Sequence, residues 1–569
     1  MRKIFLAFLT SFAITAGATN ELDLELNKYY KSNGVVVKNE SVPDYTLIRR
    51  LYLDLAGRVP TLEEAQAFSK ARFPNKKELI IDKLLFSEDY VNNFYNFFAD
   101  LYRIRPERLS DNIQMKGYPY IQYIRNSLRE DKSYNVLAKE LLTATGKPTQ
   151  NGATGYILRD DGMAFDNIAL TTQIFLGKST TCQACHDDPF GDGTQKEFYE
   201  LAAFFNNDNR ENRKDYRDIL KKVDDDIKII NKNDRIDNTV RQLLGSNLVN
   251  IVDNPNKQVK YPPDYRYSNA KPGEIAKAVS LDGKLQDIKD NKRTEVANWI
   301  ISKDEFSYAI ANRIWVNIVG NNLFYPQNIS DFSIEDAKNK ELIKFLGNYL
   351  KEHNYSIKSL VRLIALSDFY SRQSFLGTEE GYKFQGILVK RMTAHQIWDS
   401  IVTLVLDDPN YTRISFEKYS DLFEVDWNKI SGQSMLAQVA AIRDWDNSII
   451  NNVLKYKGVD LVRSCFNLRG NNGFIGLFLK EFGASERVLL DTTSDLGTVT
   501  QLLTLMNSPI IQVVTDSKSQ VMKSGDKNTI FASMMTRPAG IFEKSFIEKS
   551  TKEDLVWILL NSHEYLFRK

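Results

Sequence analysis

Three residues have the types and the spacing to hold a redox cofactor: Cys182, Cys185 and His186, which form the motif C-x-x-C-H. Two thiols at this spacing can form thioethers with the two vinyl groups of one porphyrin, and the adjacent histidine then lies beneath the iron. The chain holds 3 Cys and 4 His among 569 residues, so chance produces the motif in about one of ten thousand such chains. The spacing therefore predicts covalent haem c, with Cys182 and Cys185 binding the porphyrin and His186 as the iron ligand.

Two other interpretations of the motif remain open. The two cysteines can form a plain disulfide, with the histidine capping the adjacent turn. They can also bind a metal ion together with His186, with a fourth ligand from Asp187, Asp188 or Asp192. Structural zinc usually takes its ligands from two separated pairs, which fits this short run less well. Haem c is the favoured interpretation.

A sixth iron ligand cannot be identified from the sequence. The remaining histidines, His353, His395 and His563, are all far away along the chain, and we expect surface or hydrogen-bonded helix positions for them. Met163 is the closest upstream methionine, and an ordinary loop or core position is expected for it. Cys465 has no partner if the pair is occupied, so it should be buried as a small apolar residue.

Other groups of residues carry weaker signals. The stretch DDPFGDG could bind calcium but lacks the twelve-residue loop with its terminal Glu, so a polar turn is expected. The pairs Arg49–Arg50, Arg103–Arg105 and Asn312–Arg313 could bind anions, although arginines on amphipathic helices are usually solvated or salt-bridged. G-x-S-x-G, H-E-x-x-H and phosphate-loop motifs are absent. No catalytic residue is assigned, and the sequence favours a protein that is not an enzyme.

The N-terminus has the features of a secretory signal peptide over residues 1–18. Arg2 and Lys3 precede an apolar run, and Ala16-Gly17-Ala18 resembles a cleavage site. No Cys follows the run, so a lipoprotein anchor is not supported, and no later stretch is apolar and long enough to span a bilayer. We expect a soluble periplasmic or secreted protein, cleaved near Ala18. In an oxidising compartment a free C-x-x-C pair is the less expected state.

The overall composition is that of an ordinary globular protein, with 43% hydrophobic and 26% charged residues. The formal net charge is +2, and loss of Arg2 and Lys3 would leave 73 basic and 73 acidic residues. A balanced chain offers no electrostatic case for binding nucleic acid or an anionic membrane.

The hydrophobic pattern is mostly helical, and several helices have clear start signals. Thr61 with Glu64, and Thr194 with Glu197, predict capping boxes. The C-terminal helix is expected to be capped by Ser550 and Glu553. Apolar residues recur at helical spacing and predict two buried stripes. These residues are Phe198, Leu201, Ala202 and Phe205 in the first stripe, and Leu342, Phe345, Leu346, Tyr349 and Leu350 in the second.

The predicted fold is mainly α, with two helical domains, a charged linker containing Pro and Asn, and little β structure. The first domain covers residues 40–207 and the second covers 290–567. The linker, residues 208–289, is charge-dense and then rich in Pro, Asn and Lys over 253–274, with a short hairpin expected near Val259–Tyr261.

Two sets of motifs resemble known domains. LIRRLYLDLAGRVPT and the stretch FLGKSTTCQACHDDPFGDGTQKEFYELAAFF are similar to the planctomycete cytochrome C-like domain, the domain of unknown function numbered 1549. RTEVANWIISKDEFSYAIANRIWVNIVGNNLF, KRMTAHQIWDSIV and the C-terminal DLVWILLNSHEYLFRK are similar to its usual partner, the domain numbered 1553. The resemblance covers residues 40–207 and 290–567.

The resemblance implies an exported bacterial protein of unestablished reaction, with Cys182, Cys185 and His186 on the motif that gives the first domain its name. Members are often encoded beside a second secreted family, so a co-encoded secreted protein or a redox partner is implied. Two departures are evident. Asp188 stands where relatives usually have a second His, and a His-Pro pair common before Glu341 is absent.

These observations lead to one favoured function and two alternatives. The favoured function is that of a c-type haem protein in electron transfer or as a redox partner. The first alternative is a non-enzymatic binding or scaffold protein in which the C-x-x-C pair is a structural disulfide. A hydrolase or oxidoreductase acting on extracellular polymer has the least support from particular residues.

Overall fold

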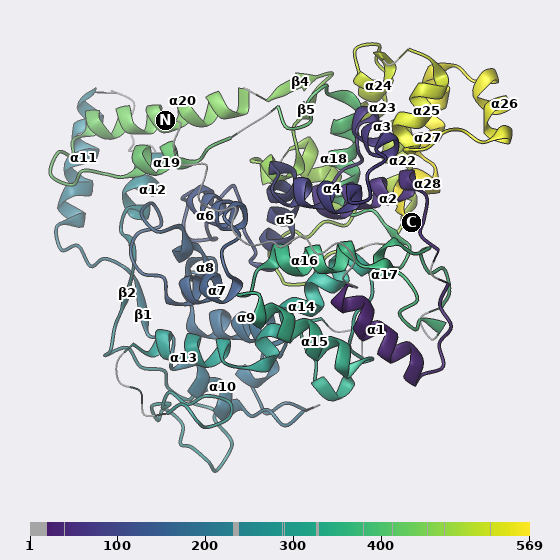
Figure 1. Ribbon diagram of the computed structural model, residues 1–569. Helices are drawn as coiled ribbons and strands as arrows, with labels where there is room; N and C mark the ends of the chain where they lie inside the picture. Colours follow the sequence, from purple (N-terminus) through teal and green to yellow (C-terminus); the bar gives the residue numbers. More distant parts are fainter. Residues whose placement is uncertain are drawn as a thin grey trace, which may run out of the picture.

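The protein is mainly helical (Figure 1), with 56% of the computed structural model in helices and only 5% in strands. The mainly α fold predicted from the hydrophobic pattern is confirmed. The structure describes residues 20–569 except 39, 190, 231–237, 287, 289–290, 326–328, 379–380, 412–413, 452, 471–472, 495 and 524. The predicted signal peptide lies outside these residues. None of the helices in the described part is long and apolar enough to cross a membrane.

The N-terminal part, residues 20–207, begins the helical array. Its helices are α1 (Glu21–Ser32), α2 (Asp44–Leu51), α3 (Leu62–Lys70), α4 (Lys76–Leu85), α5 (Glu88–Leu101), α6 (Tyr118–Arg129), α7 (Tyr134–Thr143), α8 (Gly155–Leu158), α9 (Ala164–Leu176) and α10 (Gln195–Ala202). Short turns join them: a π-helical turn η1 (Tyr52–Ala56) and the 3-10 turns η2 (Gly152–Thr154) and η3 (Cys182–Ala184).

The C-terminal part, residues 291–569, completes the array. Its helices are α13 (Lys292–Ile301), α14 (Asp304–Val319), α15 (Lys340–Glu352), α16 (Ile357–Leu366), α17 (Asp368–Ser371), α18 (Ala394–Val405), α19 (Glu417–Phe423), α20 (Gly432–Asn451), α21 (Phe474–Glu481), α22 (Val499–Asn507), α23 (Pro509–Val514), α24 (Gln520–Lys523), α25 (Lys527–Met535), α26 (Ile541–Lys549), α27 (Lys552–Leu560) and α28 (His563–Leu566). The 3-10 turns η4 (Ile334–Asp336) and η6 (Ser464–Phe466) lie between them.

Local sequence explains where many of these helices begin. The predicted capping boxes at Thr61 and Thr194 are both present. The predicted cap of the last long helix is wrong by one residue, because the side chain of Thr551 accepts from the Asp554 amide and begins α27. Ser550 instead ends the preceding helix, where its hydroxyl donates to the Phe546 carbonyl at 3.0 Å.

Three small antiparallel sheets supply the strands. β1 (Asn207–Arg210) pairs with β2 (Val249–Asp253), β3 (Lys390–Arg391) with β6 (Phe567–Arg568), and β4 (Leu454–Tyr456) with β5 (Val459–Leu461). The last pair is a tight hairpin whose central residues, Lys457 and Gly458, both have positive φ, as the twist of a two-residue hairpin loop requires. The pairing of β3 with β6 ties the C-terminus back into the core.

The predicted linker contains regular secondary structure in its described residues. It contains β1, β2 and the helices α11 (Tyr216–Ile230) and α12 (Asn238–Ser246), and α11 and α12 both pack on α20 (Figure 1). Near Val259–Tyr261, Lys260 forms an isolated antiparallel bridge to Ile275, so a long loop replaces the short hairpin that we expected. Apolar residues of this region, such as Val223 and Ile227, are buried. The many charged residues around them in the sequence make these buried positions hard to recognise.

The N-terminal and C-terminal parts share one hydrophobic core. Buried apolar residues form a single cluster that extends from Leu22 in α1 to Tyr565 in α28. At its centre lies α14, which packs against α15 and, from the N-terminal part, against α9. Its Trp315 is fully buried and stacks on Phe369, with ring centroids 5.4 Å apart.

Polar groups also cross the interface between the two parts. Arg49 and Arg50 on α2 were expected to be solvated or salt-bridged, and this expectation is wrong. Arg49 donates to the carbonyls of Met534 and Tyr565, both at 2.8 Å, and Arg50 donates to that of Arg372 at 3.1 Å. Because the C-terminal part covers α2, these guanidinium groups satisfy backbone carbonyls that would otherwise be buried without partners.

The innermost contact across the interface is an ion pair. Asp54 in η1 and Arg568 in β6 lie 2.9 Å apart, and both side chains are fully buried. The hydroxyl of Tyr370 donates to the same carboxylate oxygen at 2.8 Å, and Arg568 donates to the Leu388 carbonyl at 2.7 Å. A buried charge of this kind is stable only while its partner stays in place.

Replacing Arg568 with Met should therefore destabilise the protein strongly. The variant leaves the Asp54 carboxylate buried without its cation, which typically costs about 3–5 kcal/mol. Urea unfolding of wild type and R568M should show a clear fall in the midpoint. Lys28→Met is the matched control, because it removes an exposed ion pair with Glu25 and should leave the midpoint unchanged. Equal midpoints for wild type and R568M would contradict the role of this pair.

Candidate functional site

The C-x-x-C-H residues lie together on one short turn. After α9 the chain enters η3 (Cys182–Ala184), which packs on α10. The amides of Cys185 and His186 both donate to the carbonyl of Cys182, at 3.2 and 3.3 Å. The structure thus brings the three predicted site residues onto a single helical turn.

Side chains from α10 and its preceding loop hold this turn in position. The amide of Gln195 donates to the carboxylate of Asp187 at 2.8 Å, so Asp187 sits at the positive end of α10. The Gln195 side chain donates to the Ala184 carbonyl at 3.3 Å, and the Asp188 amide donates to the Gly193 carbonyl at 2.8 Å. The described residues of the DDPFGDG stretch thus take part in the polar turn that we expected.

All three site side chains face outward. Cys182 and Cys185 are exposed free thiols, and His186 is also exposed. Nδ1 of His186 lies 2.7 Å from the carbonyl oxygen of Asp187. When Nδ1 carries the proton and donates to this carbonyl, Nε2 keeps the lone pair that a metal binds.

A row of tyrosines lies beside the turn. Tyr199, Tyr261, Tyr265 and Tyr267 follow one another with ring centroids 5.7, 5.0 and 5.5 Å apart. The Tyr267 hydroxyl accepts from the Asp187 amide at 2.8 Å. Burial raises the pKa of Tyr199, which lies on α10, the helix that packs on the turn. The turn therefore has an aromatic surface next to its cysteines.

The structure gives no support to the metal-ion alternative. Asp187, one of its proposed ligands, is already engaged by the amide at the start of α10. Within the described part of the chain, no three His, Cys, Asp or Glu side chains are grouped so that they could hold a metal ion. The haem and disulfide interpretations both stay predictions.

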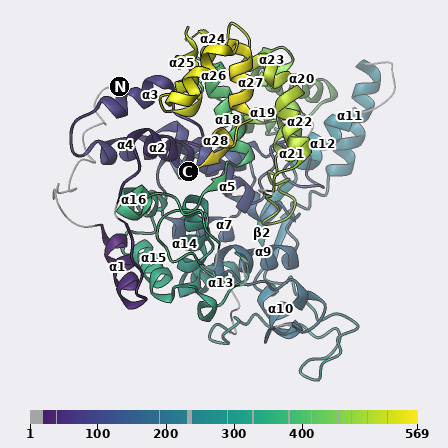
Figure 2. The same cartoon turned by 90° about the vertical axis from the view of Figure 1, so that its right-hand side faces the viewer.

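The other residues considered as ligands lie in different settings. Met163 is 53% exposed at the start of α9. His353, just after α15, stacks on Tyr349 with ring centroids 3.8 Å apart, and its Nδ1 lies 2.9 Å from the Tyr349 carbonyl. His563 is exposed at the start of α28. In both views α18 and α28 lie well away from α10 (Figures 1 and 2), so His395 and His563 are not brought to the turn.

His395 and Cys465 line one small cavity of about 50 Å³, together with Glu107 and Arg487. Cys465 is buried as expected, and burial raises the pKa of its thiol to about 11. The expectation for His395 is wrong, because both ring nitrogens are buried and neither has a hydrogen-bonding partner in the described structure. Burial lowers the pKa of His395, which keeps the imidazole neutral in the folded protein.

The other two residue pairs considered as anion sites, Arg103–Arg105 and Asn312–Arg313, make structural contacts. Arg103 pairs with Asp160 at 2.9 Å and Arg105 with Asp111 at 3.0 Å. Arg313, whose side chain is buried, pairs with Asp491 at 3.2 Å. The expectation of salt bridges holds for these three.

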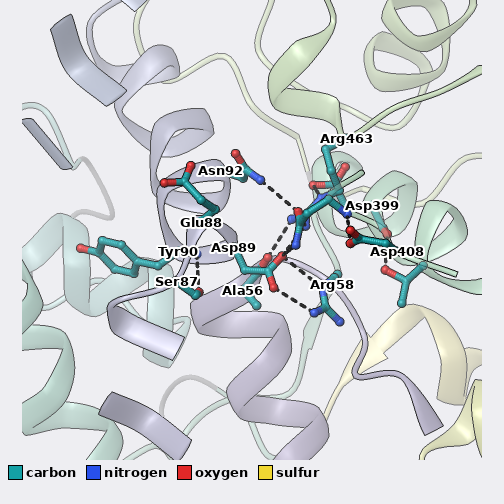
Figure 3. Close-up of polar contacts among 12 residues, drawn as sticks. Ala56, Arg58, Ser87, Glu88, Asp89, Tyr90, Asn92, Asp399, Asp408 and Arg463 are labelled. Atoms are coloured by element: carbon teal, nitrogen blue, oxygen red, sulfur yellow. Dashed lines mark hydrogen bonds and ion pairs between the residues drawn. The ribbon is translucent and has the colours of Figure 1, made fainter. Parts of the chain in front are cut away.

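A second group of polar residues, which the sequence did not indicate, joins the two parts of the chain. Arg58 and Arg463 both bind the Asp89 carboxylate, at 2.9 and 2.6 Å, and Arg463 also binds Asp399 at 2.7 Å (Figure 3). Burial alone would raise the pKa of Asp89, but the two guanidinium groups hold it well below its usual range. Asp89 and Arg463 are 374 positions apart, so no local pattern could have paired them.

Comparison with known proteins finds two family models on this chain. The first, PSCyt2, a protein of unknown function (DUF1549), matches residues 21–210. The second, PSD1, a protein of unknown function (DUF1553), matches residues 292–551. A search of curated proteins and a search of solved structures each found no match.

The buried imidazole of His395 should make stability depend on pH. An unfolded histidine has a pKa of about 6.5 and the folded pKa is lower, so below pH ~6.5 the unfolded chain binds a proton that the folded protein does not. Stability should therefore fall as the pH drops through this window, and His395→Gln should remove that part of the fall. Urea midpoints of both proteins at about pH 8 and pH 5 test this. Parallel pH profiles would contradict a neutral buried His395.

Proposed function

Since this chain belongs to the family in which a PSCyt2 (DUF1549) domain is followed by a PSD1 (DUF1553) domain, we propose that it is an exported protein that carries covalent haem c and serves in electron transfer or as a redox partner. No activity is established for these domains, although the name of the first hints at a cytochrome-like domain. The proposal rests on the residues of the turn.

One observation carries the proposal: two exposed free thiols and an exposed imidazole share one turn, and Nδ1 of that imidazole faces a backbone carbonyl at 2.7 Å. This donor set fits haem c, because the thiols are free to form thioethers and Nε2 of His186 is free to bind iron. The nearby tyrosine row offers the apolar surface against which a flat macrocycle can pack.

Each residue of the turn would have one task. Cys182 and Cys185 would anchor the porphyrin, and His186 would bind the iron through Nε2 while the Asp187 carbonyl fixes the orientation of its ring. Tyr267 and Gln195 hold Asp187 in place and so set the position of that carbonyl. The haem itself would supply a reversible one-electron change.

Exported expression together with the haem c maturation machinery tests the attachment. The mature chain should gain the mass of one haem and show a c-type pyridine haemochrome spectrum. Cys182→Ser and Cys185→Ser should each lose one thioether, which shifts the haemochrome band, whereas Cys465→Ser should keep the wild-type spectrum because Cys465 is buried elsewhere.

The outcomes separate the favoured function from its alternative. An unmodified mass without a Soret band would overturn the haem proposal. A mass lower by two hydrogens would instead favour the binding or scaffold protein with a Cys182–Cys185 disulfide.

The role of His186 has its own test. His186→Ala should keep both thioethers and the added mass but change the position of the Soret band, because the iron loses its protein ligand. The spectrum and intact mass of H186A, measured beside wild type, separate ligation from attachment. An unchanged spectrum would remove His186 from the proposal.

A further inference from the structure

A cavity of about 560 Å³ opens where the N-terminal and C-terminal parts meet, which is the size range of small-molecule sites. We call it the interface pocket and define it by Glu88, Asn92, Arg125, Arg129, Asp408 and Asn410. Glu88 and Asn92 come from the start of α5, the arginines from α6, and the last two residues from the loop after α18. It shares no residue with the C-x-x-C-H turn.

The wall of the pocket is a continuous chain of hydrogen bonds. Arg125 donates to the side-chain oxygen of Asn92 at 2.8 Å, and Asn92 donates to that of Asn410 at 3.2 Å. Asn410 in turn donates to Asp89 at 2.9 Å. The same carboxylate forms ion pairs with Arg58 and Arg463. The polar side chains are therefore fixed before any ligand arrives, which lowers the entropy cost of binding.

Arg125 is the most constrained of these residues. It is only 3% exposed, and its guanidinium lies over the rings of Phe466 and Tyr95, at 4.7 and 5.6 Å from the ring centroids. Its Nη1 has no oxygen or nitrogen partner in the described structure, and the Cys465 thiol beside it is only a weak acceptor. The two rings and the hydrogen bond to Asn92 together hold the Arg125 guanidinium in one position at the wall of the pocket.

The charges of the pocket select against an ionic ligand. Glu88 contacts both arginines, at 2.6 Å from Arg129 and 3.6 Å from Arg125, and Asp408 adds a further carboxylate. The carboxylates would repel a bound anion, and the guanidinium groups would repel a bound cation. Carboxylates and amide oxygens accept hydrogen bonds while guanidinium and amide groups donate them, so the lining matches hydroxyl groups, which do both. Phe466 and Ile414 add an apolar surface.

We propose that the interface pocket binds a neutral saccharide, with its hydroxyl groups held by Asp408, Asn410 and the α5–α6 side chains. The geometry assigns a binding role, and the inference does not depend on haem at the C-x-x-C-H turn. The ligand site would be formed jointly by the N-terminal and C-terminal parts of the chain.

Calorimetry on the full mature chain with cellotriose, laminaritriose and xylotriose tests this proposal. At least one of these neutral trisaccharides should bind, and Asp408→Asn should weaken that binding about tenfold, the effect of losing one hydrogen bond to a charged group. Asp407→Asn is the matched control, because Asp407 is on the same loop but pairs with Lys523 and does not line the pocket. Both aspartates are exposed, so both variants should fold and melt like wild type.

Three results would overturn the proposal. These are the absence of binding by every trisaccharide at millimolar concentration, an equal loss of affinity in D407N and D408N, and binding of sulfate with the same dependence on Asp408. A second variant, Asn92→Ala, should also weaken trisaccharide binding, since it breaks the hydrogen-bond chain between Arg125 and Asn410. Wild-type affinity in N92A would likewise contradict the assignment.

Discussion

Burial of charge at the junction of the N-terminal and C-terminal parts is the constraint on which the structure depends. Asp54 is fully buried against Arg568, and Asp89 is buried between Arg58 and Arg463. Removing a charge from water is costly unless its partner is present with good geometry. Arg58 belongs to the same part as Asp89, but the C-terminal part supplies Arg568 to Asp54 and Arg463 to Asp89. The two parts therefore have to be in place together.

This junction also explains how the arrangement produces a pocket. The ion pairs fix Asp89 at the start of α5, and Asp89 in turn fixes Asn410 in the loop after α18. Asn92 and Arg125 extend the same hydrogen bonds along α5 and α6. A network whose members satisfy one another is rigid, and rigidity is what a binding site for a small polar ligand needs. The structural ion pairs and the pocket thus share Asp89, which also lines the cavity.

The C-x-x-C-H turn is held in place by different interactions. It lies at the end of the molecule where α10 is found (Figure 2), and it is exposed and supported by hydrogen bonds between side chains and the backbone rather than by buried charge. Its hydrogen bonds join residues close together in the sequence, except for the one that the Asp187 amide donates to the Tyr267 hydroxyl. An exposed thiol pair is accessible both to an external haem and to the oxidant that would form a disulfide within the pair.

The sequence alone determined the features that depend on neighbouring residues. Helical periodicity predicted the fold class, and threonine and glutamate spacing predicted two capping boxes. Pairings over hundreds of residues, such as Asp89 with Arg463, leave no local pattern, and Arg49 and Arg50 resemble solvated arginines until the C-terminal part covers them. Only the tertiary structure decided these, because the cost of burying a charge depends on what packs against it.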